Sequence, residues 1–251
     1  MGKAQEQQLE EYLKQVLPQV KGVVLSDYGS GTITDKLLRQ IFAYCQAHNI
    51  PTIVDSRYDI LRFKTVDYIK QNDAELSAAI GRDLATEEEL VQGGCELLVK
   101  MSAKGALITR GEDGMSLFQI ISPQEAADYV KSQENSGSVD AGQFREGLAV
   151  KLVVKRQTGR LSVVQELISY QDRDILVSHI PVTDKSEVYD VSGAGDTCVA
   201  TVILGLAAGL EPLLACQLSN EASGIAVRKM GTSVVYAKEL KERFRQLGYE
   251  A

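Results

Sequence analysis

The sequence predicts an α/β protein built on an open, mostly parallel β-sheet with helices on both faces. Three observations support this fold class. Short apolar segments alternate with amphipathic helical segments, polar residues directly follow the apolar segments, and a glycine-rich turn precedes a long apolar helical segment. With 251 residues, 44% of them hydrophobic, the chain can bury a substantial core, and we expect a single domain over residues 1–251.

The first half of the chain alternates expected helices with expected strands. Thr34 is a predicted helix cap, and Thr86 with Glu89 forms a capping-box pattern at the start of another helix. Gly81 marks a helix end. The expected helices lie at residues 5–17, 35–48, 73–81 and 87–101, and the expected strands at 23–25, 52–54, 66–69 and 106–109, with a hairpin partner at 115–118.

Residues 119–180 are expected to form an insertion. Its first part, residues 122–133, has a helical pattern, and residues 148–168 predict a β-hairpin around 157–160. We favour an additional strand pair at the sheet edge, with a lid or dimer module as the alternative. After it, Val188 and Tyr189 indicate the end of a strand, and helices are expected near 198–208, from Pro212, and at 238–247.

Composition excludes several classes of function. A net charge of −7 argues against a general nucleic-acid or membrane-surface protein. The four cysteines are scattered without a CxxC pair, which indicates buried free thiols, and two histidines provide no His/Cys metal cluster. The polar N-terminal segment is unlike a signal peptide, and no apolar run is long enough to span a membrane, so we expect a cytoplasmic protein.

The glycine-rich turn around residues 190–197 carries the strongest functional signal. Glycines at the mouth of a helix leave its first N–H groups accessible, and these groups suit a phosphate or a developing oxyanion. Asp196 beside them could accept a proton from a hydroxyl group. The alternative is an ordinary helix entry in which Asp196 only complements the helix dipole. Other polar residues follow the expected strands, where ligands bind in such sheets. Each has a structural alternative: Asn72 with Glu75 as a capping box, and Asp27 and Asp55 as strand-end caps.

These motifs together resemble the PfkB (ribokinase-like) family of carbohydrate kinases. Residues 26–29 and 188–190 are most similar to its bacterial heptose 7-phosphate kinase branch. The resemblance implies a ribokinase-like fold, Asp196 as the catalytic base, and an anion hole formed by the backbone at Gly193, Ala194 and Gly195.

The resemblance also implies the ligands of the site. ATP and Mg²⁺ are expected, and K⁺ is a further candidate, with Asp190 helping to hold this monovalent cation. The Asn72–Glu75 motif would act through a magnesium-bound water and the phosphates, and Asp27 is a candidate contact for the substrate. The nucleotide-binding residues that the resemblance implies are Asn72, Glu75, Thr109, Gly111, Gly114, Asn220 and Gly224.

The chain also departs from the family pattern. Family members begin with a strand, a lid and a glycine-rich segment that grips the sugar, and the sequence has no counterpart of this part. We therefore expect an N-terminally truncated fold whose exposed sheet edge is covered by a second copy or a partner subunit.

Two functions follow from these observations. The first is an ATP-dependent phosphotransferase acting on a hydroxyl of a sugar or sugar phosphate, heptose-phosphate-like. The second is a non-catalytic nucleotide-binding or regulatory subunit, or one half of a split sugar kinase. A dehydrogenase is weaker, since Gly29 and Gly31 lack the third glycine of the dinucleotide motif, and no P-loop motif occurs.

Overall fold

The computed structural model describes residues 2–134, 148–158, 161–185 and 188–248. Its centre is one eight-stranded sheet with the strand order β1-β2-β3-β4-β5-β8-β7-β6. The strands are β1 Val23–Asp27, β2 Thr52–Ser56, β3 Tyr68–Asn72, β4 Gly105–Thr109, β5 Met115–Ile121, β6 Ala149–Thr158, β7 Leu161–Tyr170 and β8 Arg173–Ile180. The α-helices are α1 Lys3–Val16, α2 Asp35–Ala47, α3 Asp73–Ile80, α4 Glu87–Met101, α5 Pro123–Glu134, α6 Ala194–Ala207, α7 Pro212–Ala226 and α8 Ala237–Gln246.

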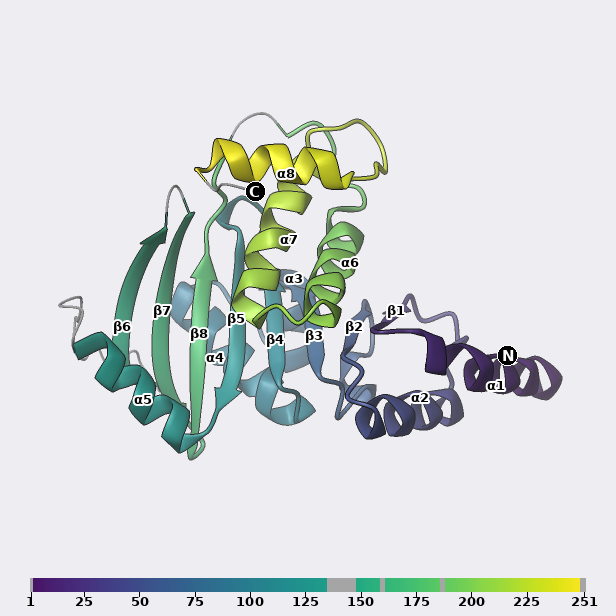
Figure 1. The fold of residues 1–251 in the computed structure, drawn as a ribbon. Helices are drawn as coiled ribbons and strands as arrows, with labels where there is room; N and C mark the ends of the chain where they lie inside the picture. The colour runs from purple at the N-terminus through teal and green to yellow at the C-terminus, as the bar shows by residue number, and fades with distance from the viewer. Residues whose placement is uncertain (1, 135–147, 159–160, 186–187, 249–251) are drawn as a thin grey trace.

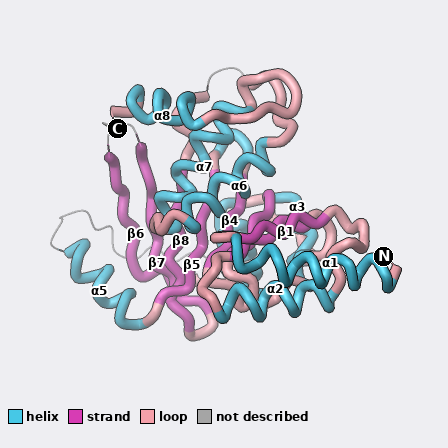
Figure 2. The backbone as a smooth tube through the Cα atoms, turned by 45° about the vertical axis from the view of Figure 1, so that its right-hand side comes forward, coloured by secondary structure: helices cyan, strands magenta, loops and turns pink. Residues whose placement is uncertain are grey.

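Helices cover both faces of this sheet, as the alternating sequence pattern predicted (Figures 1 and 2). On one face, α6 and α7 pack against inward-facing residues such as Ile53 and Leu107. On the other face, α2, α3 and α4 pack against their strand neighbours Val54 and Ile108. Successive residues of one strand therefore enter opposite cores, which explains why the central strands are apolar throughout. The expected α/β fold class is confirmed.

The two halves of the sheet differ in strand direction. Strands β1 to β4 pair in parallel, so their carboxyl ends lie along one edge of the sheet. From β4 onward, the pairs β4–β5, β5–β8, β8–β7 and β7–β6 are antiparallel. The parallel half positions the polar residues that follow each strand, and the antiparallel half extends the sheet away from them.

The insertion contributes the antiparallel edge of the sheet. The predicted hairpin is confirmed as β6 and β7, although Gly159 and Arg160 of its turn lie outside the described residues. Helix α5 packs on this hairpin through Ala126 and its apolar neighbours. The sequence analysis missed β8, which joins the hairpin to β5, because Ser178 and His179 interrupt its apolar pattern; neighbouring strands bury Ser178 and half-bury His179.

Several predicted boundaries are wrong. Helix α6 begins at Ala194 rather than near residue 198, so the glycine-rich motif forms the first helical turn. Val188 and Tyr189 are exposed and lie outside any strand; the Tyr189 N–H donates to the Val227 carbonyl instead of a sheet neighbour. Helix α7 starts at Pro212 as expected and continues through residues 220–224 to Ala226.

Local helix signals were read correctly in three places. Thr34 accepts a hydrogen bond from the Leu37 N–H at the start of α2, and Thr86 forms the predicted capping box at the start of α4. Gly81 ends α3 in the left-handed conformation that glycine favours. In the described part of the chain, no helix is long and apolar enough to cross a membrane.

Candidate active site

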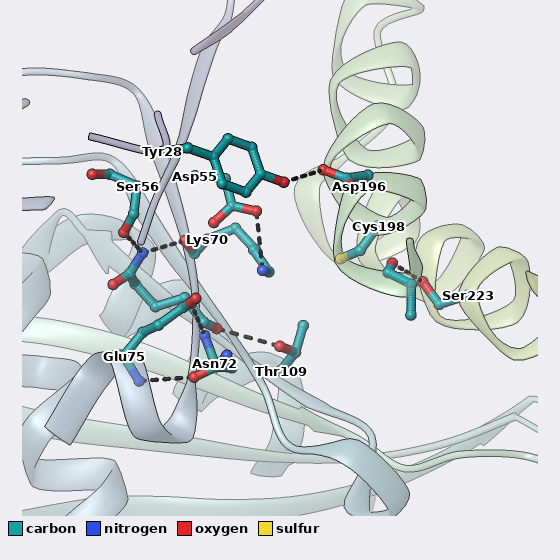
Figure 3. A network of polar contacts seen from close by, with 12 residues as sticks. Tyr28, Asp55, Ser56, Lys70, Asn72, Glu75, Thr109, Asp196, Cys198 and Ser223 are labelled. Atoms are coloured by element: carbon teal, nitrogen blue, oxygen red, sulfur yellow. Dashed lines mark hydrogen bonds and ion pairs between the residues drawn. The ribbon is translucent and has the colours of Figure 1, made fainter. Parts of the chain in front are cut away.

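The parallel strands and α6 bring the predicted site residues together (Figure 3). Asp55 lies near the end of β2, Lys70 in the middle of β3, Asn72 at the end of β3, and Thr109 at the end of β4. The N-terminus of α6 faces these strand ends from the helix layer that covers the sheet. Residues far apart in sequence thus form one polar site at the edge where open α/β sheets bind their ligands.

The N-terminus of α6 is open to a ligand. Gly193 is its N-cap with φ 79°, a left-handed conformation that favours glycine, and no side chain caps the helix. The Ala194 N–H donates to the Val191 carbonyl at 3.2 Å, whereas the N–H of Gly195, in the first turn, has no partner one turn earlier in the helix. This arrangement agrees with the predicted anion hole, since uncapped N–H groups and the helix dipole both attract negative charge.

Asp196 extends from the same helical turn toward the sheet edge. Its side chain is exposed, and Oδ1 accepts a long hydrogen bond of 3.4 Å from the Tyr28 hydroxyl (Figure 3). Tyr28 directly follows β1 and is itself exposed. The carboxylate is therefore reachable from solvent on the side of the α6 N-terminus that faces the end of β1.

A buried ion pair lies beneath the α6 N-terminus. Lys70 Nζ is 3.0 Å from Asp55 Oδ2, and the side chains of both residues are largely buried. Burial raises the pKa of Asp55, while Lys70 opposes that rise. A Cβ atom built on Gly195 would stand 3.0 Å from Lys70 Nζ, so the ammonium group lies directly at the helix mouth. The sequence analysis did not identify Lys70 as a site residue.

Asn72 and Glu75 form the capping box of α3. The Glu75 N–H donates to Asn72 Oδ1 at 2.7 Å, and the Asn72 N–H donates to Glu75 Oε2 at 2.8 Å. Their structural interpretation is therefore confirmed, and it fixes both side chains at the carboxyl end of β3. Beside them, the Thr109 hydroxyl donates to the Gln71 carbonyl at 3.4 Å.

Two further candidate aspartates bond to neighbouring backbone. The Asp27 carboxylate is buried and accepts hydrogen bonds from the Ser56 hydroxyl at 3.0 Å and the Gly29 N–H at 3.1 Å. Asp190 accepts from the N–H groups of Ser192 and Gly231 at 2.8 and 3.0 Å. These backbone hydrogen bonds, first that of Ser192, lower the pKa of Asp190, so a negative charge is held at the entrance to α6.

A cavity of about 450 Å³ lies on the other side of the α6 N-terminus, a size suited to a small-molecule ligand. The predicted residues that line it are Thr109, Gly111, Gly114, Ala194, Gly195, Asn220 and Gly224. Asp196, Gly193, Asn72 and Glu75 are not among its lining residues. The first turn of α6 therefore contributes Ala194 and Gly195 to the cavity and Asp196 to the region beside it.

The cavity walls are shaped by close contacts of the chain. A Cβ atom on Gly224 would meet nothing within 4 Å, so this glycine keeps the α7 wall of the cavity open. Gly114 has φ 85°, and a Cβ there would stand 2.1 Å from the Ile180 carbonyl oxygen, so only glycine fits this turn. The Asn220 amide donates to the Pro181 carbonyl at 2.9 Å, which ties α7 to the end of β8.

One charged network at the cavity was not predicted. Glu221 is buried and accepts hydrogen bonds from the Thr183 hydroxyl and, at 2.8 Å, from Arg243 Nε. Arg243 comes from α8 and also donates to Thr183 at 2.7 Å. The network fixes α8 over the cavity. A sequence pattern cannot reveal it, because its members come from three segments that meet only in the folded chain.

The fold and the site define the class of protein. An open sheet covered by helices on both faces, with its polar residues at the carboxyl ends of the parallel strands, is a ribokinase-like fold. Phosphofructokinase-2 from Escherichia coli in complex with potassium is 19% identical with a TM-score of 0.59, covering 99% of this chain and 64% of its own. Arabidopsis thaliana ribokinase complexed with ribose and ATP is 17% identical with a TM-score of 0.57, covering 94% and 58%. These likenesses show the fold.

Sequence comparison gives the family. Residues 2–139 and 167–238 match the pfkB family carbohydrate kinase pattern, and the chain belongs to that family. A bifunctional protein HldE from Hyphomonas neptunium is 31% identical over 242 residues, which cover 96% of this chain and 39% of the relative. The HldE of Aeromonas hydrophila is 31% identical over 229 residues, covering 91% and 36%. The chain thus spans less than two fifths of the length of these relatives.

Proposed function

We propose that the chain is an ATP-dependent phosphotransferase that moves the γ-phosphoryl group to a hydroxyl of a sugar or sugar phosphate. One observation carries the proposal: the first turn of α6 presents Gly195 to the cavity and the exposed carboxylate of Asp196 to the region outside it. A phosphate in the cavity and a hydroxyl beside Asp196 would then meet at the uncapped helix N-terminus. We assign this function to a single domain, residues 1–251, with the insertion at 119–180 as its sheet edge.

The site residues fit the chemistry of phosphoryl transfer. The cavity would hold the nucleotide, and the N–H groups of the α6 N-terminus would bind the phosphoryl oxygens. Asp196 accepts the proton of the acceptor hydroxyl as its oxygen bonds to the γ-phosphorus. The bond from that phosphorus to the bridging oxygen breaks, and its electron pair leaves on ADP.

The same geometry supports a proposal for the metal ligands. Mg²⁺, when bound, neutralises phosphate charge during transfer. The capping box uses Oε2 of Glu75, so Oε1 can accept a hydrogen bond from a magnesium-bound water. Asp190 keeps its negative charge at the entrance of α6, which suits a monovalent cation such as K⁺.

The acceptor is proposed to bind at the ends of β1 and β2. Tyr28 contacts Asp196 there, and Asp27 fixes the turn through its bond to the Gly29 N–H. The Arg57 N–H donates to the Asp27 carbonyl, which places a cationic residue at this end for the phosphate of a heptose-phosphate-like substrate. Strand β1 is an edge strand whose Val24 is 39% exposed, and we propose that a second copy or a partner subunit covers it.

Release of ADP from Mg-ATP across a panel of sugars and sugar phosphates tests the proposed function. Asp196→Asn should lower turnover by about 10²- to 10⁴-fold, the contribution of a general base, while ATP binding changes little. Asp128→Asn, on the exposed surface of α5, is the matched control and should keep full turnover. Full turnover of Asp196→Asn would refute the assignment. ATP binding without turnover on any acceptor would instead favour a non-catalytic subunit or one half of a split kinase.

A further inference from the structure

We propose that Lys70 is a further catalytic residue, whose ammonium group contacts the phosphoryl group during its transfer. This inference rests on the proposed function. Lys70 is 5% exposed, and its Nζ lies 3.0 Å from the position that a Cβ on Gly195 would occupy. The ammonium group therefore lies at the first turn of α6, beside the backbone of Gly195.

The electrostatics of this contact indicate an anionic ligand. The N-terminus of α6 carries partial positive charge, and a buried ammonium group facing it is unfavourable without a counter-ion. Asp55 balances Lys70 from the side of the sheet, at 3.0 Å. A phosphoryl group bound beside both the helix N-terminus and Lys70 would interact favourably with both, and its three oxygens gain negative charge during transfer.

Lys70 is already held in the position that this role needs. Burial is the largest single effect and lowers the pKa of Lys70, but the charge and hydrogen bond of Asp55, together with the charge of Glu75, raise the pKa above its ordinary value, so the side chain stays charged. The ion pair also immobilises the long lysine side chain before a ligand arrives. Stabilisation of a transition state is most effective when the charge is fixed in advance, because no reorganisation is then required.

Gly195 is part of the same arrangement. A side chain at this position would approach Lys70 Nζ to 3.0 Å and Cε to 3.7 Å, displacing the ammonium group from the helix mouth. The glycine thus serves two purposes: it exposes the backbone N–H groups, and it lets the lysine approach them. Neither purpose is needed if the Lys70–Asp55 pair is only structural.

The role of Lys70 in the reaction is electrostatic. It neither gains nor loses a proton: Asp196 takes the proton of the acceptor hydroxyl, the new O–P bond forms, and the bridging P–O bond breaks toward ADP. The ammonium group interacts with the oxygens of the phosphoryl group before and after its transfer. The interaction is strongest in the transition state.

The test compares Asp55→Asn with the double variant Asp55→Asn/Lys70→Met. Both lack the Asp55 carboxylate, so the double variant leaves no unpaired buried carboxylate, and the two variants differ at residue 70 alone. Calorimetry would measure the affinity of each variant, and of the unmodified protein, for Mg-AMPPNP and Mg-ADP. These ligands differ in the γ-phosphoryl group. Melting temperatures show whether each variant is folded.

The expected result is a loss of discrimination for the terminal phosphoryl group. The double variant should lose about tenfold or more of its preference for Mg-AMPPNP over Mg-ADP, and its turnover should fall about 10²- to 10³-fold below that of Asp55→Asn. Equal preference and equal turnover in the two variants would overturn the role of Lys70 and leave the proposed function intact. A preference that depends on Lys70 in a protein without turnover would support the contact while refuting phosphoryl transfer. No nucleotide binding by the unmodified protein would overturn both.

Discussion

Replacing Gly224 should change protein stability and nucleotide affinity in opposite directions. Gly224 lies in the last turn of α7 and lines the cavity, and a Cβ atom there would meet nothing within 4 Å. A side chain at this position therefore projects into the space assigned to the nucleotide. The structure predicts that Gly224→Ala and Gly224→Leu fold normally and bind ATP more weakly.

The magnitudes follow from two separate effects. Glycine within a helix costs about 0.5–1 kcal/mol relative to alanine, so Gly224→Ala should stabilise the fold. For a domain of this size, each kcal/mol corresponds to about 2–4 °C in melting temperature. Leucine adds three further carbon atoms to the cavity wall. Crowding of this kind costs about 1–3 kcal/mol of binding free energy. The dissociation constant of Gly224→Leu for ATP should therefore rise about 5- to 150-fold.

Thermal melts without ligand and calorimetric titration with Mg-ATP measure the two effects separately. Gly205→Ala is the matched control, because its Cβ would stand 2.9 Å from the Ala215 Cβ between α6 and α7, and Gly205 does not line the cavity. That variant should lose stability and keep its ATP affinity. If Gly224→Leu bound ATP as tightly as the unmodified protein, the nucleotide would not occupy this cavity along α7.

Two further predictions concern the core. Gly94→Ala should destabilise the protein by about 1–3 kcal/mol in urea unfolding, because its Cβ would stand 2.3 Å from Cζ of the fully buried Phe118 ring. Gly93→Ala should cost less, because the nearest atom to its Cβ, at 2.8 Å, is at the end of the Leu84 side chain. An equal cost for both would contradict this packing. Burial raises the pKa of Tyr68 to about 12, above the unfolded value of about 10. The contribution of the neutral Tyr68 hydroxyl to folding stability is therefore complete below about pH 10 and is lost as pH rises toward 12. Relative to Tyr68→Phe, the unmodified protein should lose about 1 kcal/mol of stability between about pH 9 and about pH 11, and a difference independent of pH would refute it.

The sequence by itself determined the features that depend on near neighbours. The capping boxes of α3 and α4 involve residues three apart, and Gly81 acts through its own backbone conformation. The parallel half of the sheet was predictable because its strands are short apolar runs buried on both faces. The same local reasoning found the glycine-rich motif and Asp196, since the motif and the helix that it opens are contiguous in the chain.

Only the tertiary structure decided which residues meet at the site. Lys70 resembles any polar strand residue until the fold places it beneath Gly195, and Glu221 resembles any helix residue until α8 brings Arg243 against it. Strand β8 escaped detection because polar residues interrupt its apolar pattern, and one of them, Ser178, is buried by strands from elsewhere in the chain. In each case the environment of a charged or polar side chain, and therefore its energy, is set by segments distant in sequence. Local patterns carry the preferences of the backbone, whereas burial and charge pairing depend on contacts that form only when the chain folds.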